Sequence, residues 1–214
     1  NDCFLRQWHE VPYTRISFRE PDRSSALNSH ATWFPHIKGG SFRKWWGNQD
    51  FLANWKDDGF AYAQYIEDHP GCGTRVHGVN DLFSPCISWS RISTGPFSIR
   101  YYPQGFTSND VAPKMTGSGI MDYRFLSFLN SSSSHYIVGT VSPGTHFEVG
   151  QIKTLPWIEP ESFDPAPIER LIEIFREDWD ARETSWDFQR PPYLLGDSSL
   201  LEELFVAWYE RSVS

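Results

Sequence analysis

The stretch 38–48, Lys-Gly-Gly-Ser-Phe-Arg-Lys-Trp-Trp-Gly-Asn, constrains the fold of this chain more than any other feature. Because glycine adopts positive φ at little steric cost, the pairs at 39–40 and 47–48 are typical of sharp changes in chain direction. Their spacing predicts a hairpin-like element whose body is the basic and aromatic run between them.

This element has two interpretations. Arg43 and Lys44 offer donors suited to phosphate groups or base edges, and Trp45 and Trp46 offer flat faces on which bases stack. Together they are typical of a loop that faces nucleic acid. In the alternative, the tryptophans fill the core and the cations lie in solvent. The residue types alone leave both interpretations open.

Length and composition indicate a chain of 214 residues with one sizeable core and an appendage. No run approaches the roughly 18 apolar residues of a membrane span, and no basic-then-apolar leader opens the chain. We expect no membrane partner. Because the chain begins at Asn1 without a Met, we expect a piece of a longer polypeptide. Three cysteines without a Cys-x-x-Cys pair favour a reducing cytoplasm over a disulfide framework.

The charge is distributed unevenly. Residues 1–157 hold fourteen Lys and Arg against thirteen Asp and Glu, which gives +1. Residues 158–214 hold five against fourteen, which gives −9. We therefore predict a body at 1–157, whose cations can gather on one face, and an acidic segment at 158–214 that faces solvent or a protein neighbour.

Strands are expected where β-branched and aromatic residues alternate with polar ones. We predict one or two strands within 3–18, broken at Pro12, and others at 51–55, 87–92, 97–102, 135–141 and 146–155. The segments at 87–92 and 97–102 form a hairpin through Ser-Thr-Gly-Pro. Polar residues 21–30 and glycine-rich residues 69–80 are expected to be loops, the second of them mobile.

Helices are expected at 121–129, from Asp164 to about 179, and at 198–211. In the second of these, Leu171, Ile172, Phe175 and Trp179 form an apolar stripe that needs a partner. The fold class is therefore α+β: a twisted mixed β-sheet body of the target-recognition type with an inserted helix, followed by an acidic C-terminal helical segment.

Several segments resemble, in the same order, the target-recognition half of the PglX adenine-specific DNA methyltransferases of BREX phage-defence systems, and of related single-chain restriction-modification enzymes. They are 38–48, 51–59, 87–95, 97–106, 128–131, 146–156 and 178–188. The resemblance runs over residues 4–195. It implies double-stranded DNA as a partner, and a methyltransferase domain in the same or a companion chain.

Catalytic motifs are missing. Adenine methylation needs a glycine-rich turn for S-adenosylmethionine and an Asn/Asp-Pro-Pro-Tyr/Phe tetrapeptide. The nearest match begins with Arg190, which offers donors where an acceptor is required. The resemblance therefore implies S-adenosylmethionine for the full-length enzyme and no cofactor in this chain. His69, Cys72 and His77 lack the second ligand pair of a structural zinc site, so we predict no metal.

Candidate DNA-binding residues lie in the segments shared with the family and near them. For base readout we predict Arg43, Asn48, Arg91 and Arg100, whose side chains suit base edges. For phosphate contacts we predict Lys38, Lys44, Lys56 and Lys114. Trp45 completes the set as a stacking residue, although it is also a candidate for the core. Arg100 has the alternative of stacking within the sheet.

The leading functional hypothesis is a sequence-specific DNA-recognition module of an adenine-specific DNA methyltransferase in bacterial phage defence. The alternative is an interaction module that docks onto other defence-complex subunits through its acidic tail and aromatic surface. Convergence of Arg43, Lys44, Arg91 and Arg100 on one concave surface favours DNA. Scattered cations and an exposed tryptophan-rich patch favour a protein partner.

Overall fold

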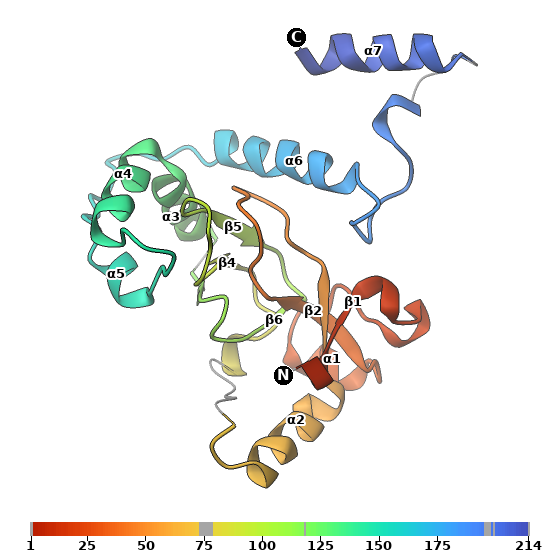
Figure 1. The fold of residues 1–214 in the computed structure, drawn as a ribbon, viewed down its shortest axis with the longest axis vertical. Helices are drawn as coiled ribbons and strands as arrows, with labels where there is room; N and C mark the ends of the chain where they lie inside the picture. The colour runs from red at the N-terminus through yellow and green to blue at the C-terminus, as the bar shows by residue number, and fades with distance from the viewer. Residues whose placement is uncertain (1, 73–78, 118, 195–197, 199, 214) are drawn as a thin grey trace.

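The computed structural model describes residues 2–72, 79–117, 119–194, 198 and 200–213, and its fold is α+β, as the sequence predicts (Figure 1). The strands are β1 (Leu5–Gln7), β2 (Trp33–Ile37), β3 (Phe51–Asn54), β4 (Cys86–Trp89), β5 (Ile99–Tyr102), β6 (Thr107–Ser108) and β7 (Lys114–Met115). The α-helices are α1 (Arg23–Asn28), α2 (Lys56–Asp68), α3 (Ile120–Asn130), α4 (Ser132–Val141), α5 (Val149–Lys153), α6 (Ala166–Asp180) and α7 (Leu201–Val213).

Two small sheets form the centre of the molecule. The first has the order β1-β3-β2-β6, with β2 and β3 antiparallel and β2 and β6 parallel. The second has the order β5-β4-β7 and is antiparallel. Its β4–β5 hairpin pairs Ser88 with Arg100. This confirms the hairpin that the alternating runs predict.

Residues 38–50 are the connection between β2 and β3, and in Figure 1 they rise from the first sheet toward α6 before they return. The predicted hairpin-like element has no strand pair of its own. Instead Trp45 forms a parallel bridge with β5: its N–H donates to the Ile99 carbonyl at 3.1 Å, and its carbonyl accepts from Tyr101 N–H at 2.8 Å. The β2–β3 connection therefore ties one sheet to the edge of the other.

The largest core lies between the second sheet and the helices α3 to α6. It includes Ile87, Trp89 and Ile99 of the sheet, and Trp46 of the β2–β3 connection. Ile168, Ile172 and Trp179 of α6 belong to this same core, and Leu171 and Phe175 pack against it. The apolar stripe of α6 thus has its partner within the chain.

Two predicted strands are wrong, because residues 135–141 lie in α4 and residues 149–153 form α5. The β-branched run of α4 follows Ser131, whose Oγ accepts from Ser134 N–H at 3.2 Å and so caps a helix. Before α5, Glu148 and Gln151 form a capping box, in which Glu148 N–H donates to Gln151 Oε1 at 2.9 Å. Helix caps and tertiary packing override strand propensity in both segments.

The loop predicted at 21–30 is also wrong in part, because α1 occupies 23–28. Its N-cap is Asp22, whose Oδ1 accepts from Ser25 N–H at 2.8 Å. Segment 3–18 holds the short β1 between 3-10 turns and an isolated bridge from Ile16 to Trp33. Residues 73–78 of the predicted mobile loop lie outside the described residues. Among the helices that are described, none is long and apolar enough to cross a membrane.

Candidate nucleic-acid interface

Arg100 holds the β2–β3 connection onto the second sheet. The side chain is fully buried on β5. Its guanidinium donates to Tyr102 Oη, to Ser90 Oγ and to the Arg43 carbonyl, at 3.2 Å in each case. Ser90 and Tyr102 donate in turn to carbonyls at both ends of the connection, those of Gly40 at 2.9 Å and Gly47 at 3.3 Å. Arg100 is therefore the centre of a buried hydrogen-bond network.

Arg43 joins the same connection to α6. Its Nη2 forms an ion pair with Asp178, its Nε donates to the Trp46 carbonyl at 3.4 Å, and its guanidinium lies 5.0 Å from the Trp179 ring centroid. Only 14% of the side chain is exposed. At Gly47, φ is +123° and an added Cβ would lie 2.6 Å from Arg43 Nε, so glycine makes this close packing possible.

Lys44 and Asn48 also make internal contacts. Lys44 Nζ donates to the Asn130 carbonyl at 2.8 Å, at the C-terminus of α3, where the helix dipole favours a cation. Asn48 is buried, and its Nδ2 donates to the Ser41 carbonyl at 2.8 Å. These contacts fix the conformation of the β2–β3 connection from within.

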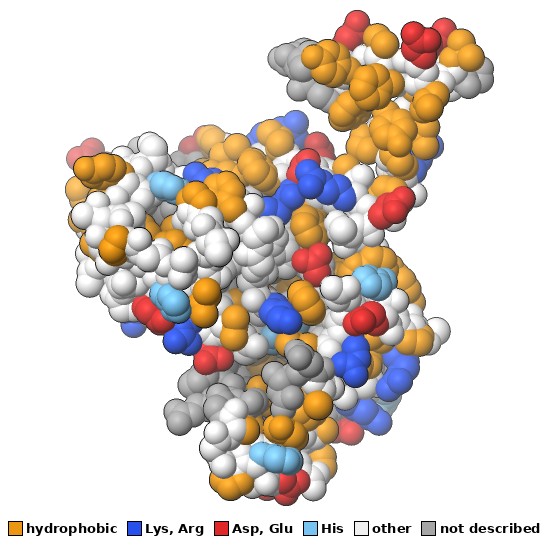
Figure 2. All heavy atoms as spheres, viewed as in Figure 1, with side chains coloured by type: hydrophobic (Ala, Val, Ile, Leu, Met, Phe, Trp, Pro, Cys, Tyr) orange, Lys and Arg blue, Asp and Glu red, His pale blue; other side chains and the backbone are white. Residues whose placement is uncertain are grey.

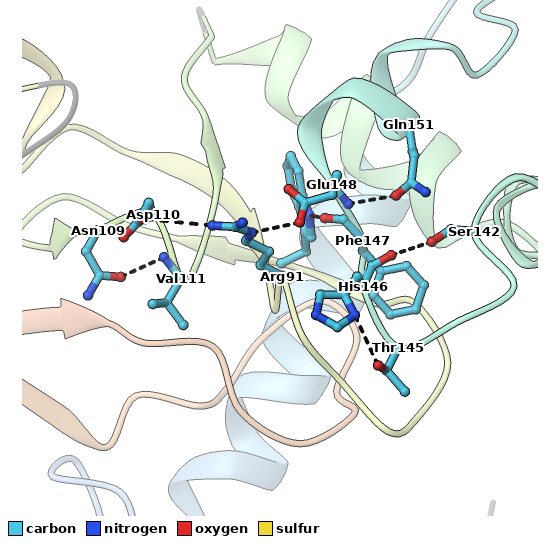
Figure 3. Close-up of polar contacts among 11 residues, drawn as sticks. Arg91, Asn109, Asp110, Val111, Ser142, Thr145, His146, Phe147, Glu148 and Gln151 are labelled. Carbon is cyan, nitrogen blue, oxygen red and sulfur yellow. Dashed lines mark hydrogen bonds and ion pairs between the residues drawn. The ribbon is translucent and has the colours of Figure 1, made fainter. Parts of the chain in front are cut away.

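Arg91 lies beyond β4, between two carboxylates (Figure 3). Its Nε donates to Glu148 Oε1 at 2.9 Å, and its Nη1 lies 3.7 Å from Asp110 Oδ2. Figure 3 also shows Glu148 in contact with Gln151 at the start of α5. Arg91 therefore links the α5 cap to the segment before β7, with 38% of its side chain still exposed.

The remaining lysines lie at separate places. Lys38 Nζ is 4.1 Å from the Phe51 ring centroid. Lys114 Nζ donates to the Asp81 carbonyl at 2.8 Å, and burial lowers the pKa of its ammonium group. Lys56 is exposed at the start of α2.

The predicted residues do not converge on one open surface. Five of the nine fix the β2–β3 connection through the bonds described above: Arg43, Lys44, Trp45, Asn48 and Arg100. The DNA contacts predicted for the nine residues stay a prediction. Nor do the tryptophans form an exposed patch, because each of the ten is buried or half-buried.

A hollow of about 750 Å³ lies between α6 and the body, and we call it the α6 groove. Arg170 and Arg176 line it from α6, and Arg19 lines it from the N-terminal segment. Figure 2 shows Lys and Arg side chains gathered next to α6. Aromatic walls complete the groove, among them Phe18, Tyr101 and Trp186.

Two buried donors of the β2–β3 connection also line the α6 groove. Trp46 and Gln49 are 6% and 4% exposed, and Trp46 Nε1 and Gln49 Nε2 have no hydrogen-bond partner among the described residues. A buried donor without a partner costs roughly 1–3 kcal/mol. A ligand that brings acceptors to these two groups offsets that cost.

The arginines of the groove are paired with exposed or half-buried carboxylates, and Glu169, Glu173 and Asp187 line the groove beside them. Arg19 contacts Asp187 at 2.9 Å, and Arg170 contacts Glu173 at 3.1 Å. Arg176 lies 3.5 Å from Asp180, and its guanidinium is 5.5 Å from the Trp46 ring centroid. Exposed pairs of this kind contribute about 0–1 kcal/mol, so a phosphate group can displace them at small cost.

The net acidity of residues 158–214 hides Arg170 and Arg176 in the sequence. On α6, Arg176 follows Ile172 by four residues and precedes Trp179 by three, which places it beside the apolar stripe. That helical spacing was the available signal for Arg176, whereas Arg19 and Arg170 have no such relation to the stripe. Gln49 carried no signal of its own.

The described residues contain no group of three or more His, Cys, Asp or Glu side chains that could hold an ion. His77 of the predicted trio lies outside the described residues. The other two are exposed: His69 Nδ1 lies 3.0 Å from the Tyr65 carbonyl, and Cys72 is a free thiol.

Comparison with known proteins places the chain near two methyltransferases. It is 38% identical over 192 residues to the adenine-specific methyltransferase PglX of Lacticaseibacillus casei (strain Zhang), a match that covers 88% of this chain and 16% of that protein. It is 29% identical over 192 residues to the adenine-specific methyltransferase BrxX of Escherichia coli O9:H4 (strain HS), covering 88% of this chain and 15% of that protein. No protein-family model matches.

The chain spans about one sixth of the length of these curated relatives. The matches confirm the resemblance to a region of PglX-like adenine-specific methyltransferases.

Proposed function

We propose that this chain recognises double-stranded DNA for an adenine-specific, S-adenosylmethionine-dependent DNA methyltransferase that acts in bacterial phage defence. The α6 groove is the DNA-contacting surface. The observation that carries the proposal is the set of donors in this groove: the exposed arginines Arg19, Arg170 and Arg176 beside the unpartnered Trp46 Nε1 and Gln49 Nε2.

The chemistry of the groove suits a nucleic-acid strand. Arginine forks match phosphate oxygens bidentately, and aromatic walls accept bases or sugars by contact. The amides of Gln49 and Gln104, which both line the groove, each offer a donor and an acceptor. Phosphate contacts position the strand, whereas the amides are suited to read base edges.

The rest of the enzyme supplies the methyl-transfer chemistry. S-adenosylmethionine binds to a methyltransferase domain in the same or a companion chain, because this sequence lacks both the glycine-rich turn and the catalytic tetrapeptide. We place the assembly in the cytoplasm, where the free cysteines of this chain stay reduced.

The test is the salt dependence of duplex DNA binding, measured by fluorescence anisotropy for the 214-residue chain and for the complete enzyme. Arg170→Gln should make the slope of log K against log salt shallower by about 0.9, the value for one lost phosphate contact on B-DNA. Lys153→Gln is the matched control, because it removes one exposed cation of α5 that does not line the groove. Salt-independent binding, or equal slopes in both variants, contradicts the proposal.

A second function is favoured by α7. Its large apolar side chains Leu201, Phe205 and Tyr209 are 61%, 50% and 54% exposed, and Figure 2 shows hydrophobic side chains gathered over α7 and the segment before it. Such a patch is typical of a protein-binding surface. The second proposal is therefore that α7 docks onto another part of the enzyme or onto another defence subunit. Deletion of residues 195–214 should then impair assembly while it leaves the salt slope unchanged.

A further inference from the structure

A second hollow, of about 440 Å³, lies at the N-terminus of α3, and we call it the Asp122 pocket. Asp122 lines it together with Asp81, Tyr101 and Tyr123. Hydroxyl groups of Ser84 and Thr116 lie in the same lining, which contains no Lys, Arg or His. The pocket is within the size range of small-molecule and nucleotide sites, roughly 300–1,000 Å³.

Asp122 is an incompletely bonded buried acid. The residue is 2% exposed, and its Oδ1 has no hydrogen-bond partner among the described residues. Burial raises the pKa of its carboxyl group to about 6, although the backbone N–H of Gly117 opposes the shift. An added Cβ at Gly117 would lie 2.6 Å from Oδ1, so the backbone of that residue passes directly over the acid. Natural proteins leave few such groups unpaired, so Oδ1 can accept a further donor.

The walls of the pocket are aromatic. The rings of Tyr101 and Tyr123 have centroids 5.7 Å apart and planes inclined by 56°. Both tyrosines, together with Pro85, also line the α6 groove, so the two hollows share a wall. A ligand held in the groove can therefore extend into the pocket.

The two hollows differ in chemistry. The groove presents three arginines and two unpartnered donors beside three carboxylates, whereas the lining of the pocket holds two Asp residues and no cation. Cationic donors for phosphate are therefore present in the first hollow and absent from the lining of the second. A flat ring with an amino group fits the pocket, because the carboxylate accepts from the amine while the tyrosine rings contact the face of the ring.

We propose that the Asp122 pocket binds an unstacked nucleobase with an exocyclic amine, adenine or cytosine, of a strand whose phosphates lie in the α6 groove. Asp122 accepts a hydrogen bond from the amine, and Tyr101 and Tyr123 hold the base. The inference rests on the proposed function, since it assumes that the groove binds nucleic acid. Thymine is disfavoured because it lacks the amine, and its single N3–H donor lies between two carbonyl groups that the carboxylate repels.

Short single strands test this directly, because their bases need no unpairing. The affinities of dA, dC and dT pentanucleotides for the 214-residue chain are compared at pH 7.5. We expect dA and dC to bind at least about fivefold more tightly than dT, the low end of discrimination by one base contact. Asp122→Leu, which removes both acceptors at similar volume, should reduce the difference to less than about twofold. Asp68→Leu, at the exposed end of α2, is the control and should retain it.

A measurement on the unaltered chain keeps the test valid if the Asp122 variant misfolds. Titration with the dA pentanucleotide should shift the amide NMR signals of Gly117, Asp122 and Tyr123. Equal affinity for all three strands, or shifts confined to other residues, overturns the inference. Shifts of the same amides by N-acetyl-lysine methylamide but not by the dA strand also overturn it, since the pocket then takes a protein amine.

The outcome separates the inference from the proposed function. If the pentanucleotides show no base preference while Arg170→Gln still reduces the salt slope for duplex DNA, only the base pocket is lost. If duplex binding shows no salt dependence, the proposed function is contradicted, whatever affinities the pentanucleotides show.

Discussion

His36 is buried in β2 in a tautomer that does not tolerate protonation. Its ring Nδ1 lies 2.9 Å from Thr107 Oγ1, and that hydroxyl donates to the Pro35 carbonyl at 3.1 Å. Because the hydroxyl proton is used there, Nδ1 must donate to Thr107. The other nitrogen, Nε2, is then an acceptor, and it is buried without a partner. Protonation would place a charged donor where the described residues supply no acceptor.

The size of the effect follows from the pKa. Burial lowers the pKa of His36 from 6.5 to about 3 in the folded chain. A folded-state pKa below the unfolded value means that stability is complete above pH 6.5 and is lost as the pH falls toward 3. Between pH 7.5 and pH 5.0, protonation of the unfolded chain at this one residue lowers the free energy of unfolding by roughly 2 kcal/mol.

Urea unfolding at pH 7.5 and pH 5.0 measures this loss, with His36→Gln as the comparison. Other titrating groups are common to both chains and cancel in the difference between them. The wild-type chain should lose about 2 kcal/mol more than His36→Gln over this interval. The exchange His9→Gln, which keeps His36, should leave the wild-type loss in place. Equal losses in the wild-type and His36→Gln chains would refute the buried neutral histidine.

Other predictions concern α6 and the cysteines. Trp179→Ala should lower the free energy of unfolding by about 3–5 kcal/mol in urea titrations, because the side chain is only 6% exposed. Ile174 is 43% exposed on the same helix, so Ile174→Ala should change that free energy by less than about 1 kcal/mol. Similar losses in both variants would show that α6 does not pack on the core. Arg43 and Asp178 form an ion pair. In a double-mutant cycle of unfolding free energies, Arg43→Ala and Asp178→Ala should therefore be coupled by at least about 0.5 kcal/mol. Additive losses would exclude the ion pair. Burial raises the pKa of the Cys86 thiol to about 12. Maleimide should therefore modify the two exposed cysteines first, which mass spectrometry can follow. Modification of Cys86 at the same rate would contradict its burial.

Elements with strong local signals could be predicted from the sequence. The stripe of α6 repeats over enough residues to define both the helix and its buried face. The runs that form β4 and β5 are joined by a turn signal that defines the hairpin, although every residue of β4 is buried, so no alternation defines a buried face there. By contrast, α4 combines strand-forming residues with a serine cap, and its helical state depends on packing of Ile137 and Val138 against the large core. Residue propensities alone do not predict that tertiary contact.

The candidate site shows the same limit. The cations of residues 38–48 suggested a surface, but β5 contributes a buried arginine that binds the backbone of this stretch, and α6 contributes Asp178 to pair with Arg43. Both partners are remote in sequence, so their geometry emerges only in the folded chain. Trp46 lies in the core, as the alternative interpretation of the stretch predicts, whereas half-buried Trp45 contributes backbone bonds. The cations Arg43 and Lys44 are bonded to α6 and to the end of α3 instead of lying free in solvent.

The central claim is that this region selects the DNA sequence that the enzyme methylates. The most direct measurement exchanges the region for its counterpart in a relative with a different methylated motif, and then maps methylated adenines in genomic DNA by long-read sequencing. If this chain reads the target, the methylated motif changes to that of the region's donor. If the motif stays with the unchanged methyltransferase part, the chain does not recognise the target and the account is contradicted.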